Sequence, residues 1–167
     1  KHINDVALIK ESSVTMQKFS GVQNEASARR RKLLHGDIAR IEAYDISHLS
    51  GKDVVGVMVA IVDGVAEKSE YRKFKIKIEK NDDTAGLREI LTRRFKHEEW
   101  AMPDLVVIDG GMGQINMAKR VVKNIPIVSI VKNDAHKLDH FLGDEEIVKD
   151  HSKAILLANS EAHRFAI

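Results

Sequence analysis

The sequence contains no cysteine among its 167 residues. This absence excludes disulfide bonds, thiolate zinc sites and catalysis by a cysteine nucleophile, and it fits a reducing cytoplasm. Long apolar runs are absent too. The longest run, residues 54–62, contains Gly56 and is far shorter than the roughly 20 residues that a membrane helix needs. We therefore expect a cytoplasmic protein that has no membrane partner.

The N-terminus begins at Lys1 and shows neither an initiator Met nor a signal-peptide pattern. At the other end, the sequence stops within the apolar run Phe165-Ala166-Ile167. These two features predict that the chain is a fragment of a longer protein. The sequence also contains no internal repeat and no low-complexity tract.

The composition is that of a globular domain of ordinary size, with 43% hydrophobic and 31% charged residues. A formal net charge of +2 and an isoelectric point near 8.8 permit a nucleic-acid partner without requiring one. Binding to DNA would therefore have to come from local clusters among the 27 Lys and Arg residues.

The sequence predicts an N-terminal helical segment over residues 1–36 and a main domain over residues 37–167. The first part holds a helical pattern at residues 5–19 and a basic run at residues 29–32. We interpret the basic run as a solvated helix face rather than a DNA-binding patch.

The main domain begins with three predicted strands, over residues 38–47, 53–62 and 70–79. Asp63-Gly64 after the second strand is a hairpin signal, and the third strand alternates apolar residues with lysines. A capped helix ending near Phe95 follows. The remaining predicted elements are a buried strand (105–108), a helix (113–123), a buried strand (127–131), a hairpin around Gly143-Asp144 (138–149) and a final helix (154–167).

This order places three antiparallel strands before parallel strands that are joined by right-handed crossovers. It predicts an α/β fold with a ribonuclease H-like mixed sheet, in which a three-strand antiparallel meander is extended by parallel strands and flanked by helices. Such a fold does not by itself establish a function.

Two aspartates stand out because of their apolar surroundings. Asp45 lies inside the first strand, where an acid is costly unless it is paired or bound to a metal. Asp109 ends the run Leu105–Ile108, at the carboxyl end of a strand, where ligand sites in α/β sheets are common. The alternative for Asp109 is a capping role at the helix that starts near Gly113.

Two carboxylates on adjacent strands would form half of a site for Mg²⁺ or Mn²⁺, since these ions prefer oxygen ligands. Phosphodiester hydrolysis uses such ions to activate water and to neutralise the leaving oxygen. His163 in the final helix is a third candidate, although a single helical His is usually an ordinary hydrogen-bonded residue.

Five segments carry a resemblance to a known family. They are Glu42-Ala43-Tyr44-Asp45-Ile46-Ser47-His48, Tyr71-Arg72-Lys73-Phe74, Asp82-Asp83 with Leu87–Phe95, Pro103–Gln114 with its Ile108-Asp109-Gly110-Gly111 core, and Glu161-Ala162-His163-Arg164-Phe165-Ala166-Ile167. In sequence and order they resemble motifs of the UvrC family, the nuclease component of the UvrABC excinuclease. The resemblance covers residues 41–167, about three quarters of the chain.

The resemblance implies a ribonuclease H-like endonuclease domain whose Asp-Asp-His triad falls on Asp45, Asp109 and His163. These residues would be both catalytic and metal-binding. An accessory acid of the family falls on Asp82 or Asp83, where helix capping competes with a catalytic role. The implied activity is the incision 5′ to a DNA lesion in nucleotide excision repair, a part of the SOS response to DNA damage.

The resemblance implies damaged double-stranded DNA as the partner, together with a UvrB–DNA complex bound through parts of the full-length protein that are absent here. The GIY-YIG nuclease, the UvrB-interacting segment and the tandem helix-hairpin-helix module are not in this sequence. Two positions depart from the family pattern: Ser160 replaces an acid, and Met112 stands where a basic residue is common.

For DNA phosphates the sequence offers Lys132, Arg164, Arg93 and Arg94, and the alternative for the arginines is ordinary surface ion pairing. Two other functions compete with the nuclease. One is a non-catalytic ribonuclease H-like module that only binds nucleic acid or a partner. The other is a resolvase or transposase core, although many of those enzymes complete their site with a carboxylate rather than with a His.

Overall fold

The computed structural model describes residues 37–48, 54–77 and 82–167. The predicted N-terminal segment, including its helix at residues 5–19, lies outside the described residues. The elements are β1 (Arg40–His48), β2 (Val54–Val62), β3 (Val65–Ala66), the short 3₁₀ helix η1 (Lys68–Glu70), β4 (Arg72–Ile76), α2 (Asp83–Arg94), β5 (Leu105–Asp109), α3 (Met112–Val121), β6 (Ile127–Lys132), β7 (Leu138–Leu142) and α4 (Glu145–Ala166).

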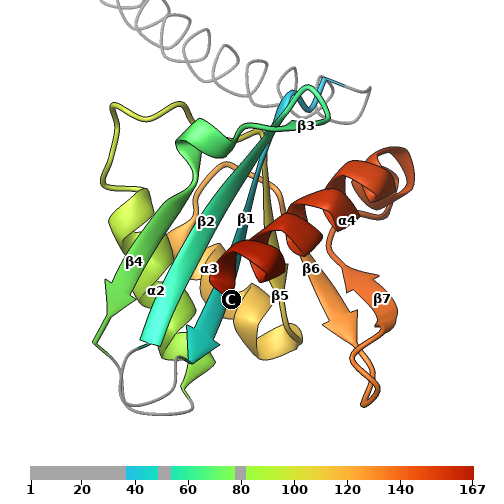
Figure 1. Cartoon of the computed structure of the whole chain (residues 1–167). Helices are drawn as coiled ribbons and strands as arrows, with labels where there is room; N and C mark the ends of the chain where they lie inside the picture. Colours follow the sequence, from blue (N-terminus) through green and yellow to red (C-terminus); the bar gives the residue numbers. More distant parts are fainter. Residues whose placement is uncertain (1–36, 49–53, 78–81) are drawn as a thin grey trace, which may run out of the picture. The chain divides into compact units, whose positions relative to one another are not determined.

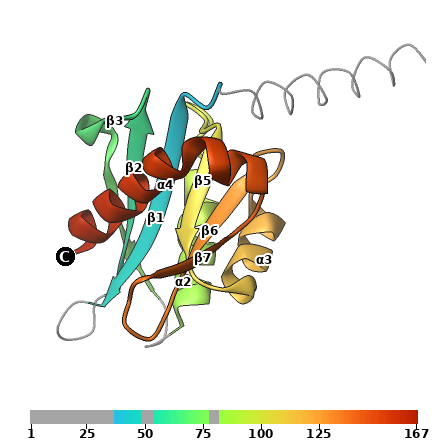
Figure 2. The same ribbon diagram turned by 90° about the vertical axis from the view of Figure 1, so that its right-hand side faces the viewer.

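One seven-stranded mixed sheet organises the domain, with the strand order β3-β2-β1-β5-β6-β7 and with β4 paired to β2. Helix α4 covers one face of this sheet, and α2 and α3 cover the other face (Figures 1 and 2). The predicted ribonuclease H-like α/β fold is therefore confirmed. None of the helices in the described ranges is long and apolar enough to cross a membrane.

The antiparallel meander forms where the sequence predicts it. β1 and β2 pair along their whole length, from Arg40 opposite Val62 to His48 opposite Val54. The turn after β2 has positive φ angles at both Asp63 (50°) and Gly64 (79°). Such angles favour Asp-Gly in a two-residue hairpin, whose twist matches that of the flanking strands.

The parallel part of the sheet follows from two apolar strands and two crossover helices. β5 pairs with β1 on one side and β6 on the other, both in parallel, and its residues 105–108 are fully buried. A strand that is buried on both faces reads as a continuous apolar run, as the sequence of β5 does.

The predicted hairpin over residues 138–149 is wrong, because only its first half is a strand. β7 pairs antiparallel with β6, and the chain turns at Gly143, which has a positive φ angle. The Asp144 carboxylate then accepts hydrogen bonds from the backbone N–H groups of Glu146 (3.0 Å) and Ile147 (3.1 Å). This N-cap starts α4 at Glu145, and the helix is kinked at His151 (φ −123°), so the predicted final helix at 154–167 corresponds to the segment after the kink.

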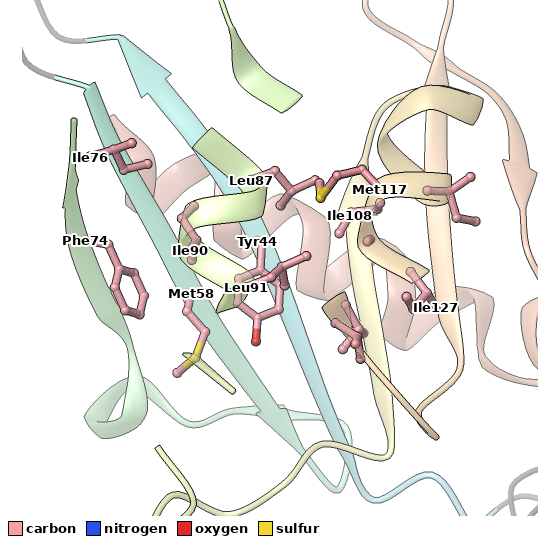
Figure 3. Close-up of a cluster of buried hydrophobic side chains, with 14 of the residues drawn as sticks. Tyr44, Met58, Phe74, Ile76, Leu87, Ile90, Leu91, Ile108, Met117 and Ile127 are labelled. Atoms are coloured by element: carbon pink, nitrogen blue, oxygen red, sulfur yellow. The ribbon is translucent and has the colours of Figure 1, made fainter. Parts of the chain in front are cut away.

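The main core lies between the sheet and helices α2 and α3, and Figure 3 shows its side chains. Tyr44, Met58, Phe74, Leu91 and Ile108 from four strands and α2 meet there. Helix α2 approaches β2 closely, because a Cβ atom at Gly56 would lie only 2.1 Å from the Ile90 side chain. A glycine at this position therefore sets the distance between helix and sheet.

A buried charge network ties α2 to β1. The Glu42 and Arg94 side chains are both 0% exposed and form a two-point ion pair, with N–O distances of 2.9 Å. Arg40 contacts the same carboxylate at 2.8 Å, and the Tyr44 hydroxyl donates to it at 2.6 Å. Burial, followed by the Glu42 charge, raises the pKa of Tyr44 far above its usual value, so this phenol remains a neutral donor.

Replacing Glu42 by Gln should lower the free energy of unfolding by about 3–5 kcal/mol, because Arg94 would remain buried without a carboxylate partner. Urea unfolding of both proteins measures the difference. Glu89→Gln is the matched control, since it removes an exposed i,i+4 pair with Arg93 and should cost less than about 0.5 kcal/mol. Equal losses for the two variants would contradict the importance of the buried pair.

Candidate functional site

Asp45 and Asp109 lie side by side at the carboxyl ends of β1 and β5. The two strands pair in parallel, with Ala43 opposite Val107, and each aspartate lies two residues further along its strand. Side chains two residues apart lie on the same face of a strand, so both carboxylates share the face that α4 covers. They line one pocket of about 600 Å³.

His163 reaches the same pocket from the last turn of α4. Its Nδ1 atom lies 3.2 Å from Oδ2 of Asp45, and its ring is 66% exposed. The second oxygen of Asp45 accepts a hydrogen bond from the backbone N–H of Ile46 at 2.8 Å. The structure therefore brings together the three residues that the sequence predicts as a triad.

The electrostatics of the pocket favour a cation. Burial raises the pKa of the Asp45 carboxyl, and the neighbouring Asp109 charge raises it further. The hydrogen bonds from Ile46 and His163 act in the opposite direction without reversing the shift. A positive charge between the two aspartates would offset both their desolvation and their mutual repulsion.

Lys132 places a positive charge beside Asp109, since its Nζ atom contacts Oδ2 of that residue. Both side chains are about a quarter exposed, at 25% and 27%. Lys132 ends β6, the strand next to β5, so its position also depends on the parallel pairing. The sequence predicts Lys132 as a phosphate contact, and the structure places it within the acid pocket.

The turn after Asp109 brings backbone close to the pocket. Gly110 has a φ of 138°, a backbone angle that residues other than glycine rarely adopt. The N–H of Gly111 donates to the Gln114 side chain at 3.1 Å, and Gly111 is the N-cap of α3. Asp109 therefore does not cap this helix, and its carboxylate is directed to the pocket instead.

The donor set of the pocket fits a hard divalent ion, because it combines two carboxylates with an imidazole. As the side chains stand, no three His, Asp or Glu residues in the described ranges are grouped tightly enough to hold a metal. In this arrangement the ammonium group of Lys132 contacts Asp109, one of the two carboxylates. Asp45, Asp109 and His163 therefore have the chemistry to bind the ion, and in this structure Asp109 forms an ion pair with Lys132.

A cluster on the outer side of α4 fixes the helix turn that carries His163. The Tyr71 hydroxyl donates to the Glu161 carboxylate at 2.7 Å, and Arg164 contacts the same carboxylate at 2.6 Å. The Phe165 ring packs edge-on against Tyr71, with centroids 5.1 Å apart. The sequence analysis missed this Tyr71–Glu161 clasp, although its residues belong to two of the quoted motifs.

Several other predicted site residues lie outside the pocket. Asp82 caps α2 by accepting from the N–H of Ala85 at 2.9 Å, and Asp83 pairs with His48 at 2.6 Å. Arg93 pairs with Glu89 and donates to the carbonyl of Lys75. The prediction that Arg94 contacts DNA is wrong, because the side chain is fully buried against Glu42. Arg164 is 59% exposed but paired with Glu161.

The order of the strands and the acid pair at their carboxyl ends define a ribonuclease H-like domain with an acidic pocket. The family model described as the UvrC RNase H endonuclease domain matches residues 30–167. The chain belongs to this family.

Relatives with substantial sequence identity lead to the same family. The chain is 41% identical over 170 residues to UvrABC system protein C of Caldicellulosiruptor saccharolyticus, covering 93% of this chain and 29% of that protein. It is 44% identical over 141 residues to UvrABC system protein C of Koribacter versatilis, covering 77% and 23%. The chain thus spans less than a third of the length of these relatives.

The solved structures that match this chain are more distant. Endonuclease V of Ciona intestinalis, in complex with a DNA containing inosine, has a TM-score of 0.44 and 12% identity over 70% of this chain and 58% of that chain. A protein of unknown function from Archaeoglobus fulgidus has a TM-score of 0.39 and 21% identity over 77% and 68%.

The raised pKa of Asp45 should respond to its two neighbours in opposite directions. Asp109→Asn removes a repulsive charge and should lower the pKa, whereas His163→Ala removes a hydrogen-bonding group and should raise it. Carboxyl ¹³C chemical shifts followed through a pH titration of the metal-free chain measure both changes. A pKa unaltered by Asp109→Asn would contradict the proximity of the two carboxylates.

Tyr71→Phe should loosen the last turns of α4 while keeping the ring contact with Phe165. We expect a loss of stability of about 1 kcal/mol, as for a typical hydrogen bond, and faster amide exchange over residues 158–166 than elsewhere. Tyr44→Phe is the matched control, because it removes a hydroxyl from the network around Glu42 on the other sheet face. If both variants affected α4 equally, the clasp would have no local role.

Proposed function

We propose that this domain hydrolyses a phosphodiester bond of damaged double-stranded DNA, as the 5′ incision of nucleotide excision repair. The observation that carries the proposal is the pair of carboxylates, Asp45 and Asp109, on adjacent parallel strands that line one pocket. Membership of the UvrC RNase H endonuclease domain family supports the same reaction.

The cofactor in this proposal is Mg²⁺ or Mn²⁺, held by Asp45 and Asp109, with His163 as the third ligand or as a group that acts on the phosphate. A bound divalent ion supplies the charge neutralisation and the activation of water that phosphodiester hydrolysis requires. An imidazole among the ligands makes the site softer and favours Mn²⁺ over Mg²⁺.

Lys132 has two partners in this proposal. In the free protein its ammonium group neutralises Asp109. When a cation is bound to Asp109, Lys132 becomes available to a phosphate oxygen of the DNA at the mouth of the same pocket. The close turn at Gly110 and Gly111 leaves room for that strand, because neither residue has a side chain.

Targeting to the lesion is assigned to the rest of the full-length protein. The curated relatives are more than three times as long as this chain, as their coverage of 29% or less requires. We therefore place the contact with a UvrB–DNA complex in parts outside this domain. The domain itself contributes the cutting site and phosphate contacts from Lys132 and Arg164.

Incision by the full-length protein tests the proposed function. Asp109→Asn and His163→Ala should each lower the rate of 5′ incision of a lesion-containing duplex by more than about 100-fold, since loss of even an outer partner of a metal ligand costs about 10- to 100-fold. The reaction contains the other UvrABC components and either Mg²⁺ or Mn²⁺. Asp139→Asn is the control, because its exposed carboxylate pairs with the adjacent His140 on β7.

The pH dependence adds a second readout. Both aspartates must be ionised to bind a cation, so the affinity for Mn²⁺ should fall as the pH decreases through the raised pKa of Asp45. Normal incision by Asp109→Asn would contradict a catalytic site here. Unchanged DNA binding without any incision by the wild-type protein would instead favour a non-catalytic binding module.

A further inference from the structure

The edge strand β4 presents lysines on one face and apolar residues on the other. Phe74 and Ile76 are 4% and 5% exposed and belong to the core under α2. Because side chains alternate along a strand, Lys73 and Lys75 lie on the opposite face. Both lysines are exposed.

This lysine-bearing face is also the face of the acid pocket. Strand pairing places Lys73, Val57 and Asp45 in one row across β4, β2 and β1. The next row contains Lys75, Val55 and Ser47. Neighbouring strands lie about 4.8 Å apart, so the backbone of Lys73 is about 10 Å from that of Asp45.

Helix α4 ends between the lysines and the pocket. Figure 1 shows its C-terminal turns crossing in front of β1 and β2, with β4 beyond them at the edge of the sheet. The ammonium group of Lys73 lies 4.8 Å from the centre of the Phe165 ring. Phe165 is two residues after His163, so this contact holds the lysine beside the helix turn that carries the proposed triad histidine.

We propose that Lys73 and Lys75 bind consecutive phosphates of the DNA strand that enters or leaves the acid pocket. This surface, which we name the β4 lysine edge, deepens the function proposed above and rests on it. A strand whose scissile phosphate lies at Asp45 and Asp109 would have its next phosphates within reach of β4. The lysines would contact only the sugar-phosphate backbone of the DNA, so this binding has no preference for base sequence.

The chemistry of the face favours phosphate as the ligand. Alternate residues on a strand are about 6.7 Å apart, which is of the order of the separation between neighbouring phosphates of one DNA strand. Glu161, an acid on the adjoining turn of α4, is already bonded to Tyr71 and Arg164. Two aspartates in the pocket repel a polyanion, so cations beside them are needed to hold the strand there.

The test compares two pairs of lysines on opposite faces of the sheet. Lys73→Gln/Lys75→Gln removes two charges from the β4 lysine edge. The control Lys119→Gln/Lys123→Gln removes two exposed charges on and just after α3, which packs against the other face. Equal net charge makes the two variants directly comparable. Lys73→Arg/Lys75→Arg keeps the charge and serves as a rescue.

The measurement is binding of a short fluorescent DNA duplex to this chain, titrated over a range of salt concentrations. Each lost phosphate contact should reduce the slope of log K against log salt by about 0.9, and the double glutamine variant should lose about 1.8. The α3 control and the arginine variant should keep the wild-type slope. In the full-length protein, the glutamine variant should raise the KM for incision and leave kcat unchanged.

Each result decides between the possibilities. If both glutamine variants weaken binding equally, only net charge matters and the β4 lysine edge is overturned, while the proposed nuclease function is untouched. If the β4 variant loses kcat rather than affinity, the lysines act in another way and the proposal also fails. If the wild-type chain binds DNA without salt dependence, and full-length Asp109→Asn incises normally, both the edge and the proposed function are wrong.

Discussion

The parallel pairing of β1 with β5 is the constraint on which the site depends. It places Asp45 beside Asp109 and directs both carboxylates to the same side of the sheet. A shift of one residue in this register would move one acid to the face that packs against α2 and α3. The same pairing positions β6, so the contact of Lys132 with Asp109 also follows from it.

Side chains on the two faces of β1 have different roles: those on one face stabilise the fold, and Asp45 on the other face belongs to the pocket. Glu42 and Tyr44 point to the core under α2, where the carboxylate binds Arg94 and Arg40. Asp45 points to the opposite face, where it meets His163. Because successive residues alternate between faces, two acids three positions apart in one strand serve different purposes.

The surroundings of Asp45 in the acid pocket disfavour its ionised form. Burial and the charge of Asp109 both raise the pKa of Asp45, and the hydrogen bonds from Ile46 and His163 offset part of that shift. Lys132 contacts the other carboxylate, Asp109. Such a site should bind a cation more tightly than an exposed pair of carboxylates would, since burial reduces screening by water. On the same helix turn as His163, Glu161 accepts a hydrogen bond from the Tyr71 hydroxyl, which ties this turn to the start of β4.

The sequence by itself determined the strands, the crossover order and the two aspartates, because alternation, apolar runs and turn residues are local signals. It also predicted that Asp45, Asp109 and His163 belong together, through motifs rather than through geometry. Only the tertiary structure decided that Arg94 is buried and that Tyr71 binds Glu161. Those outcomes depend on partners distant in sequence, such as Glu42, 52 residues before Arg94, and a local pattern carries no information about which distant residue will become the partner.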